Sequence, residues 1–335
     1  MGMIDVRDLT KIYDSKIVAV DHISFSVKEG EVVAMLGPNG TGKTTTVKML
    51  TTLTRPTSGE AELDGHSVVR NADEVRRIVG IVPQDLSVDD DLTGMENLIL
   101  QSKLYHIPSD VAKKRAIELL RLVDLEKAAF RDVEIYSGGM RKRLEIICGL
   151  ISHPRVLFLD EPTLGLDLQS RIAVRNYLKK LKHEQNLTLF LTTHYMEEAD
   201  YIADRVIIMD KGRIVSSGTP VELKISLGPR IFELTLEGDP DSNNVVQRIQ
   251  GVLTVDRVDA SSYRVKIKCT EEELTQITRQ LEATNVRIIS SGFKVPTMDD
   301  VFLYFTGSSL TNKQPLDEQE GKLTKYLNKK RNTME

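Results

Sequence analysis

The sequence has few cysteines, few aromatic residues and no excess of positive charge. Its 335 residues include two cysteines and no tryptophan, aromatic residues make up 5%, and the formal net charge is −4. Cys148 and Cys269 lack the close spacing of metal ligands, so we expect both to be core thiols. Without a basic excess to neutralise phosphates, the chain lacks the general signature of a nucleic-acid-binding protein, and we expect no nucleic-acid partner.

Long apolar runs are also missing. No stretch approaches the about 18 consecutive apolar residues that a membrane-spanning helix needs. The N-terminus lacks the charged and then apolar pattern of a signal peptide. We therefore expect a cytosolic chain. If the chain serves a membrane process, the spanning part must be another polypeptide.

Residues 1–225 are predicted to form one large α/β domain. Short apolar strands alternate there with longer helical stretches, which is typical of a mostly parallel sheet covered by helices, with some antiparallel strands. The clearest strands are expected at residues 31–36, 155–160, 187–191 and 205–210. Between about residues 88 and 150 the strand pattern is absent, and Thr93 with Glu96 has the spacing of a helix capping box. This segment is predicted to be a helical insert.

After Gly228 the order of predicted elements changes to strand, helix, strand, strand, helix and strand. These elements are expected at residues 231–236, 242–249, 253–258, 263–269, 271–282 and 286–291, followed by a short helix at 297–304. Residues 263–269 alternate apolar and basic side chains, as in a sheet with one solvated face. The order predicts a small ferredoxin-like α+β domain over residues 228–306. The polar residues 307–335 are predicted to be a tail without fixed structure.

The role of this small domain is left open by its residues, which include no paired carboxylates, ligand cluster or phosphate loop. Three roles remain: packing that stabilises the large domain, dimerisation or regulation, and sensing of a small ligand. We favour dimerisation or regulation, because a one-sided sheet leaves an edge and a face available for self-association.

Residues 37–44 follow a predicted strand and open a predicted helix, which is the context that a phosphate-binding P-loop needs. Glycine permits backbone torsions closed to other residues, so successive N–H groups can curve around a β-phosphate. Lys43 would add a charge between the β- and γ-phosphates, and the Thr44 hydroxyl could bind Mg²⁺. The predicted nucleotide-binding residues of this segment are Gly37, Pro38, Asn39, Gly40, Thr41, Gly42, Lys43, Thr44 and Thr45.

Asp160 and Glu161 end another apolar strand, and sheets of this kind bind ligands at the carboxyl ends of their strands. Successive strand residues point to opposite sides, so the two carboxylates can have different roles. Asp160 is suited to hold Mg²⁺ through its water shell, and Glu161 can act as the general base toward an attacking water. Alone, the pair could equally be an exposed strand end, but after a P-loop it points to nucleotide hydrolysis.

Ser137, Gly138 and Gly139 precede a predicted helix and offer a second anion cradle. It would consist of exposed N–H groups, a hydroxyl and the positive end of the helix. A single chain does not need two cradles for one γ-phosphate, whereas two chains that face each other head to tail do. We therefore expect two copies of the chain to share two nucleotide sites.

In this order the P-loop, the Ser-Gly-Gly turn and the Asp-Glu strand resemble the nucleotide-binding subunit of ATP-binding cassette (ABC) transporters, over residues 1 to about 220. The resemblance implies a P-loop NTPase fold, ATP and Mg²⁺ as cofactors, and ATP hydrolysis. It also implies a separate transmembrane permease, with this chain peripheral at the cytoplasmic face of the membrane. In that family the Ser-Gly-Gly turn of one subunit completes the ATP site of the other.

The resemblance assigns roles to four more positions. Tyr13 lies where an aromatic residue stacks on adenine, and Asp167 belongs to the loop between the subunits. Gln84 matches the glutamine that contacts Mg²⁺ and water, and His194 matches the histidine that contacts the γ-phosphate. The predicted catalytic residues are thus Lys43, Gln84, Glu161 and His194, and the predicted Mg²⁺ ligands are Thr44, Gln84 and Asp160.

Residues 136–140, which include the Ser-Gly-Gly turn, form the signature of this family, whose commoner sequence is Leu-Ser-Gly-Gly-Gln. Here Tyr136 and Met140 occupy the two ends, so a glutamine contact to the partner's nucleotide is absent. This variant, with the basic run after it and residues 296–302, resembles the antibiotic-export branch typified by daunorubicin-resistance ATPases. That second resemblance covers nearly the whole chain and implies an exporter of drugs or other small amphipathic molecules. An importer ATPase and a soluble ABC ATPase outside transport are the alternatives.

Overall fold

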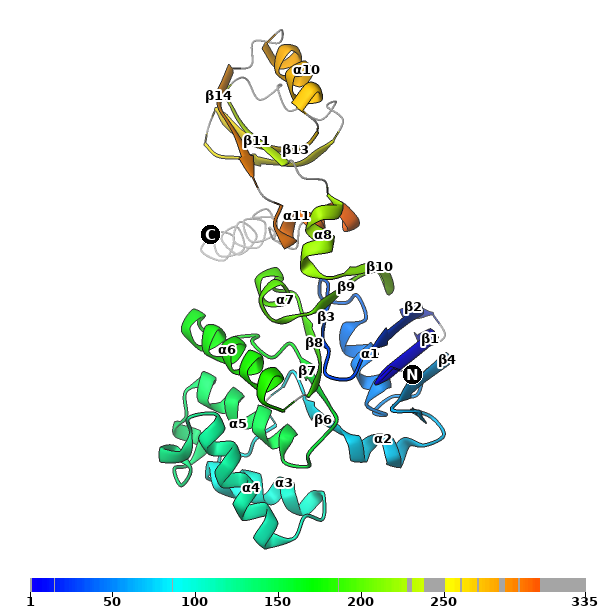
Figure 1. Ribbon diagram of the computed structural model, residues 1–335, viewed down its shortest axis with the longest axis vertical. Helices are drawn as coiled ribbons and strands as arrows, with labels where there is room; N and C mark the ends of the chain where they lie inside the picture. The colour runs from blue at the N-terminus through cyan, green and yellow to red at the C-terminus, as the bar shows by residue number, and fades with distance from the viewer. Residues whose placement is uncertain are drawn as a thin grey trace, which may run out of the picture.

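The computed structural model shows a large domain, a helical insert and a small domain in one elongated arrangement (Figure 1). The helices of the insert lie at one end, the sheets of the large domain lie in the middle, and a separate sheet lies at the other end. The structure describes residues 2–14, 16–85, 87–185, 187–227, 231–237, 251–259, 261–269, 271–282, 287–294 and 296–307.

The central sheet of the large domain has the strand order β10-β9-β3-β8-β7-β6. Its strands are β3 (Val32–Leu36), β6 (Val79–Val82), β7 (Val156–Asp160), β8 (Thr188–Thr193), β9 (Arg205–Asp210) and β10 (Arg213–Gly218). All neighbours are parallel except β9 and β10. Every residue of β3, β7 and β8 is buried, because both faces of the sheet are covered. The expected parallel α/β core is confirmed.

The two faces of the central sheet belong to different cores. Val33 and Met35 of β3 pack in one apolar cluster, and Val32, Ala34 and Leu36 pack in the other. The first cluster also includes α1 (Lys43–Leu50) and an antiparallel sheet of order β2-β1-β4-β5. The strands of that sheet are β1 (Ile4–Tyr13), β2 (Ile17–Val27), β4 (Ser58–Leu63) and β5 (His66–Ser67), and α2 (Ala72–Ile78) follows them. The second cluster packs the helices on the opposite face.

The helical insert contains α3 (Gly94–Leu104) and α4 (Ser109–Leu122), and α5 (Gly138–Leu150) returns the chain to the sheet. The predicted capping box at Thr93 is confirmed: its hydroxyl accepts from Glu96 N at 3.2 Å, and Glu96 Oε2 accepts from Thr93 N at 2.9 Å. The buried guanidinium of Arg115 in α4 donates to the carbonyls of Leu150 and Ile151 at 2.7 and 2.9 Å. This contact holds the end of α5 against α4.

Two further helices of the large domain follow strands of the central sheet. Helix α6 (Leu168–Gln185) follows β7, and α7 (Met196–Ile202) follows β8. No helix among the described residues is long and apolar enough to cross a membrane. Cys148 is buried in the core, where burial raises the pKa of its thiol to about 12, and Cys269 is half-buried.

The small domain has a four-stranded antiparallel sheet of order β12-β13-β11-β14. Its elements are β11 (Ile231–Glu237), β12 (Val252–Arg257), β13 (Ser262–Lys268), α10 (Glu271–Glu282) and β14 (Arg287–Lys294). With the first strand between the third and the fourth, this is the strand order of a ferredoxin-like unit. The predicted helix at 242–249 and the tail beyond residue 307 lie outside the described residues.

The last helix, α11 (Met298–Thr306), packs on the large domain and not within the core of the small sheet. Its side chains Met298, Val301 and Phe302 belong to the same apolar cluster as the helices of the large domain. Figure 1 shows α11 beside α8 (Pro220–Ser226), between the sheet of the small domain and the central sheet of the large domain. The chain therefore leaves the large domain, forms the small sheet, and returns.

The expectation of a fully solvated basic face on the small sheet is wrong in part. Lys266 of β13 donates to Asp300 of α11 at 2.9 Å, and the Lys268 ammonium lies 4.4 Å from the ring centroid of Tyr304. Asp300 is fully buried, so its charge requires a nearby cation. Helix α11 thus covers part of the face that the alternating pattern had predicted to be free.

Candidate active site

A tight loop connects β3 to α1, and two of its glycines have backbone conformations that residues with side chains rarely adopt. Gly40 and Gly42 have φ angles of 82° and 99°. A Cβ atom on Gly42 would also lie 2.2 Å from the carbonyl oxygen of Ala19 in β2. The Thr41 hydroxyl closes the loop by donating to the Pro38 carbonyl at 2.9 Å. The loop has the tight course that a phosphate cradle requires.

A hollow of about 430 Å³ opens beside this loop. It is lined by Ala19, Asn39, Gly40, Gly42, Lys43, Thr44, Thr45, Gln84 and Glu161. These residues are far apart in the sequence. They lie close together in the fold because the carboxyl ends of parallel strands meet at one edge of the sheet. Tyr13 is not among them: its side chain is 36% exposed, and the Lys11 ammonium lies 5.0 Å from its ring centroid.

Lys43 is the first residue of α1, and its side chain is buried within the loop. Nζ donates to the carbonyl oxygens of Gly37 at 2.7 Å and Pro38 at 3.0 Å. It also forms an ion pair with Glu161 Oε1 at 3.1 Å. The P-loop and the end of β7 therefore share one buried positive charge.

Glu161 follows the last residue of β7 in an unusual backbone conformation. Its φ of 50° is rare for a residue with a side chain and stores about 1–3 kcal/mol of strain. The backbone N–H is held by Thr192, 3.2 Å from the carbonyl oxygen and 3.0 Å from Oγ1. This conformation turns the carboxylate toward Lys43 on one side and His194 on the other, where Oε2 lies 2.7 Å from Nδ1.

The surroundings of Glu161 set its protonation state. Burial alone would raise the pKa of its carboxyl group. The hydrogen bond with His194 and the positive charge of Lys43 outweigh burial, so the pKa of Glu161 lies below its usual value. Glu161 is therefore an ionised carboxylate at neutral pH, although only 5% of it is exposed.

Asp160 faces different partners from Glu161. Its Oδ1 accepts from the hydroxyls of Thr44 at 3.1 Å and Thr192 at 2.5 Å. Thr44 and Asp160 thus offer the hard oxygen atoms that Mg²⁺ prefers. In the part of the chain that the structure describes, no group of three or more His, Cys, Asp or Glu side chains could hold a metal ion. A Mg²⁺ ion here would take its remaining ligands from water and substrate phosphates.

Three residues around the site have positions that the sequence analysis missed. Thr192 supports both Asp160 and Glu161, and the hydroxyl of Thr193 donates to Glu198. Glu198 is almost completely buried, and burial raises its pKa to about 7. A signal existed for the threonines, because two hydroxyl side chains follow the apolar run of residues 189–191 at the carboxyl end of the strand.

The Ser-Gly-Gly turn lies apart from the hollow beside the P-loop. Ser137 is the N-cap of α5, and its hydroxyl accepts from Met140 N at 3.3 Å. Gly138 lines a different hollow of about 260 Å³, together with Gln84 and residues 164–166. Gln84 therefore borders both hollows, whereas the turn does not border the P-loop of its own chain.

Asp167 caps the helix that follows the Asp-Glu strand. Ser170 donates to it from N at 2.9 Å and from Oγ at 2.6 Å, and these hydrogen bonds hold the pKa of Asp167 below its usual value. A Cβ atom on Gly139 would lie 2.6 Å from Ser170 Oγ, so the close packing of α5 on α6 requires a glycine there. The loop at Asp167 and the signature turn are thus held side by side.

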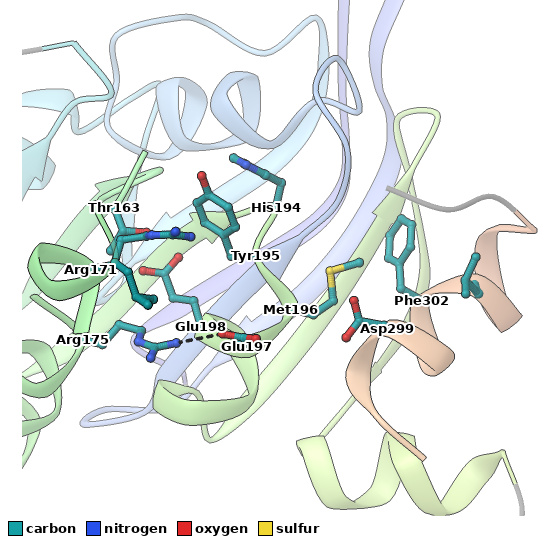
Figure 2. A pocket seen from close by; sticks show the side chains of 12 residues that line it. Thr163, Arg171, Arg175, His194, Tyr195, Met196, Glu197, Glu198, Asp299 and Phe302 are labelled. Carbon is teal, nitrogen blue, oxygen red and sulfur yellow. Dashed lines mark ion pairs between the residues drawn. The ribbon is translucent and has the colours of Figure 1, made fainter. Parts of the chain in front are cut away.

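His194 borders a third hollow, of about 430 Å³, which lies against α11 (Figure 2). Asp299 and Phe302 of α11 line it opposite residues of α6 and α7. The ring centroids of Tyr195 and His194 lie 4.0 Å apart, and the Arg171 guanidinium lies 5.0 Å from the ring centroid of Tyr195. Helix α11 therefore contacts the surroundings of a predicted catalytic residue.

Two protein families match the chain. The family described as "ABC transporter" matches residues 20–164, and "ATP-binding protein DrrA1-3-like, C-terminal domain" matches residues 218–306. Among solved structures, cbiO1 from Clostridium perfringens, part of the ABC transporter complex cbiONQ, has a TM-score of 0.62 at 28% identity, covering 66% of this chain and 90% of that one. The cassette MJ0796, as a dimer bound to ADP and Pi, has a TM-score of 0.58 at 29% identity, covering 65% and 98%.

Curated relatives match nearly the whole chain. The doxorubicin resistance ATP-binding protein DrrA of Mycobacterium tuberculosis is 39% identical over 307 residues, which cover 90% of this chain and 92% of that protein. The daunorubicin resistance ATP-binding protein DrrA3 of Streptomyces coeruleorubidus is also 39% identical, covering 91% and 96%. The linearmycin resistance ATP-binding protein LnrL of Bacillus subtilis is 34% identical, covering 92% and 99%. The chain therefore belongs to the ATP-binding cassette transporter family, as an ATP-binding subunit that hydrolyses ATP.

Proposed function

We propose that this chain energises an exporter of drugs or other small amphipathic molecules, from the cytoplasmic face of the membrane, through a separate transmembrane subunit. The names of its relatives support export: they include doxorubicin, daunorubicin and linearmycin resistance proteins and a Nod factor export protein. These names do not favour the importer or the soluble non-transport alternative. The helical insert offers exposed apolar side chains for the membrane partner, with Leu104, Phe130 and Ile135 exposed by 67%, 79% and 69%.

The observation that carries the hydrolytic mechanism is the Glu161 carboxylate, held between Lys43 and His194. Its lowered pKa keeps it ionised, so it can accept a hydrogen bond from water and orient that water toward the γ-phosphorus. The water oxygen forms the new bond to phosphorus as the bond to the β-phosphate oxygen breaks, and the water proton passes to Glu161. Lys43 and the P-loop N–H groups stabilise the charge that develops on the phosphate oxygens.

Mg²⁺ fits the oxygen atoms of Thr44 and Asp160, with Gln84 bordering the same hollow. When bound, the ion neutralises phosphate charge. Thr192 keeps Asp160 in position through its hydroxyl, which also supports the backbone of Glu161. The two adjacent carboxylates are thus assigned to separate tasks.

Two copies of the chain form the complete site in this proposal. Ser137 and Gly138 do not line the hollow that contains Lys43, which supports a role toward the nucleotide of a second chain. A related cassette of known structure is a dimer. Tyr13 would contribute adenine stacking, and Asp167 would lie at the contact between the chains.

The small domain acts, in this proposal, as a regulator of turnover. Helix α11 lines the hollow that His194 borders, and the buried side chains of α11 are part of the core of the large domain. A change in the seating of α11 would therefore reach the surroundings of the catalytic histidine. This contact favours regulation over the sensing of a small ligand.

The test of the hydrolytic site is Glu161→Gln, with Glu198→Gln as its matched control. Glu161→Gln should bind ATP with wild-type affinity and slow single-turnover hydrolysis by about 10²-fold or more, because it loses the general base. It should also accumulate as an ATP-bound dimer in sedimentation. Glu198→Gln changes a neighbouring buried carboxyl that does not contact Lys43, and should keep turnover within a few-fold of wild type. Equal single-turnover rates for Glu161→Gln and wild type would remove Glu161 from this role.

A further inference from the structure

Behind the Ser-Gly-Gly turn, helix α5 carries a buried ion pair. Lys142 Nζ lies 2.6 Å from Glu145 Oε2, and the two side chains are 4% and 0% exposed. Removing two charges from water costs free energy that a pair of apolar residues would not cost. The neighbouring residues Leu144, Ile146 and Ile147 are fully buried and already anchor the helix in the core. Packing of α5 therefore does not account for the charge pair.

The second oxygen of Glu145 makes a contact outside its own helix. Oε1 accepts from the backbone N–H of Ser87 at 2.6 Å, and the Ser87 hydroxyl lies 3.4 Å from the same oxygen. Ser87 lies a short way along the chain from Gln84, which borders the hollow beside the P-loop. Glu145 thus connects the loop that carries Gln84 to the helix that begins with the Ser-Gly-Gly turn.

A second contact between this loop and α5 is more exposed. Arg141 donates to Asp90 Oδ2 at 3.2 Å, and the two side chains are 20% and 49% exposed. Solvent-exposed ion pairs contribute little, whereas a buried carboxylate that accepts a backbone N–H makes a stronger, charge-assisted hydrogen bond. The contact between Ser87 and Glu145 is therefore the main side-chain link between the loop and α5.

We propose that Glu145, held in orientation by Lys142, is a positioning residue that couples the two ATP sites of a dimer. The proposal rests on the two-chain site described above. When Gln84 adjusts to the nucleotide in its own chain, its loop carries the Ser87 N–H with it. Because leaving Glu145 Oε1 buried without its donor is unfavourable, α5 follows. The turn at the start of α5 then changes its position relative to the nucleotide of the partner chain.

Two double variants isolate the hydrogen bond from the charge. Lys142→Met with Glu145→Gln and Lys142→Met with Glu145→Leu both remove the ion pair as a whole, so neither leaves an unpaired buried ion. Glutamine keeps an oxygen acceptor for Ser87 N–H, whereas leucine, of similar size, does not. The measurements are ATP affinity of the single chain, the Hill coefficient of ATP hydrolysis, and ATP-driven dimerisation in the Glu161→Gln background.

The coupling predicts that the two variants differ. The leucine variant should keep the single-chain ATP affinity and the melting temperature. Its Hill coefficient should fall toward about 1. Its dimer should be about tenfold weaker, because a hydrogen bond to a charged group changes an equilibrium constant by about tenfold or more. The glutamine variant should keep both the cooperativity and the dimerisation.

Three results would overturn the proposal, and the last of them is distinguishable from the first two. If both double variants match wild type in cooperativity and dimerisation, or if both lose them equally, the hydrogen bond from Ser87 does not couple the sites. If the Glu161→Gln chain itself stays monomeric in ATP, the two-chain site is contradicted, and the coupling with it.

Discussion

The edge of the central sheet at Lys43 and the start of α5 at Ser137 are both suited to anions, but they are built on opposite principles. At the sheet edge, Glu161 forms an ion pair with Lys43 and a hydrogen bond with His194, and Lys43 and Glu161 line the same hollow. At the start of α5, the basic side chains have partners within their own chain: Arg141 donates to Asp90 and to a carbonyl, and Lys142 pairs with Glu145, while both line the hollow at Gly138. The turn itself offers an anion the Ser137 hydroxyl and the backbone N–H groups at the start of the helix.

In the proposed two-chain site, this difference gives each chain a separate role toward each of two nucleotides. In the proposed mechanism, the sheet edge holds a cation, a general base and oxygen ligands, so it binds phosphate and supports chemistry. Among the described residues that line the hollow at Gly138, there is no carboxylate or imidazole that could act as a general base. The turn can complete a site but cannot form one.

The largest effect is expected from breaking the two regions separately. Lys43→Ala should abolish nucleotide binding, and Ser137→Arg should leave single-chain binding intact, while each lowers hydrolysis by about 10²-fold or more. Mixed in equal amounts, the two variants form heterodimers in which one site combines two intact halves. Hydrolysis should then recover to about a quarter of wild type, from random pairing of a symmetric dimer.

The recovery is measured as steady-state hydrolysis against the mixing ratio, with heterodimer formation followed by differently tagged chains. A control mixture of Lys43→Ala with a chain that carries both substitutions should stay inactive, because no site has two intact halves. An inactive mixture despite confirmed heterodimers would mean that the two regions do not meet across chains, or that one site cannot work without the other.

A second test concerns the paired charges of the sheet edge alone. The hydrogen bond with His194 is the first of the contacts that lower the pKa of Glu161 against the effect of burial. In His194→Ala that contact is lost, so the pKa of Glu161 should rise, and the acid side of the profile of kcat against pH should move to higher pH. His153→Ala removes a histidine outside the site and should leave the acid side in place. An unshifted profile in His194→Ala would contradict the assignment of Glu161 as the titrating base.

The smallest effect is expected from Glu198, a buried carboxyl group next to the sheet edge. The pKa of Glu198 is about 7 in the folded chain, against 4.5 for an unperturbed glutamate. Between pH 4.5 and pH 7 the folded chain therefore binds a proton that the unfolded chain does not, and the free energy of unfolding falls as the pH rises through this range. Glu198→Gln removes this loss and should raise Tm by several °C at pH 8 while changing it little at pH 5. The exposed neighbour Glu197→Gln should not change Tm at either pH. Equal Tm shifts of Glu198→Gln at both pH values would show that the carboxyl does not titrate in this way.

The sheet edge could be predicted from the sequence because its determinants are local. Apolar runs give buried parallel strands, and the polar residues that end them, such as Asp160 and His194, must lie at one edge. The loop before Lys43 follows from its glycines, two of which have positive φ angles. The tasks assigned to these residues remain predictions.

Contacts across the fold could not be predicted in this way. The alternation in β13 shows which side chains share a face, but not that α11 covers Lys266 through Asp300. The hydrogen bond between Ser87 and Glu145 joins the loop after β6 to helix α5, and neither residue belongs to a recognisable motif. Glu198 gave no signal either, because its burial depends on how α7 packs.

The packing of α11 changes how the small domain must be regarded as a piece of chain. Since Met298 and Phe302 complete the core of the large domain, the small sheet is an insertion between α8 and α11 and not an appendage at the end. A chain cut after Leu227 would lose part of the core of the ATPase itself, so its failure would reveal nothing about the sheet. The informative deletion is internal: it removes residues 229–295, bridges the gap with a short flexible linker, and keeps the returning helix.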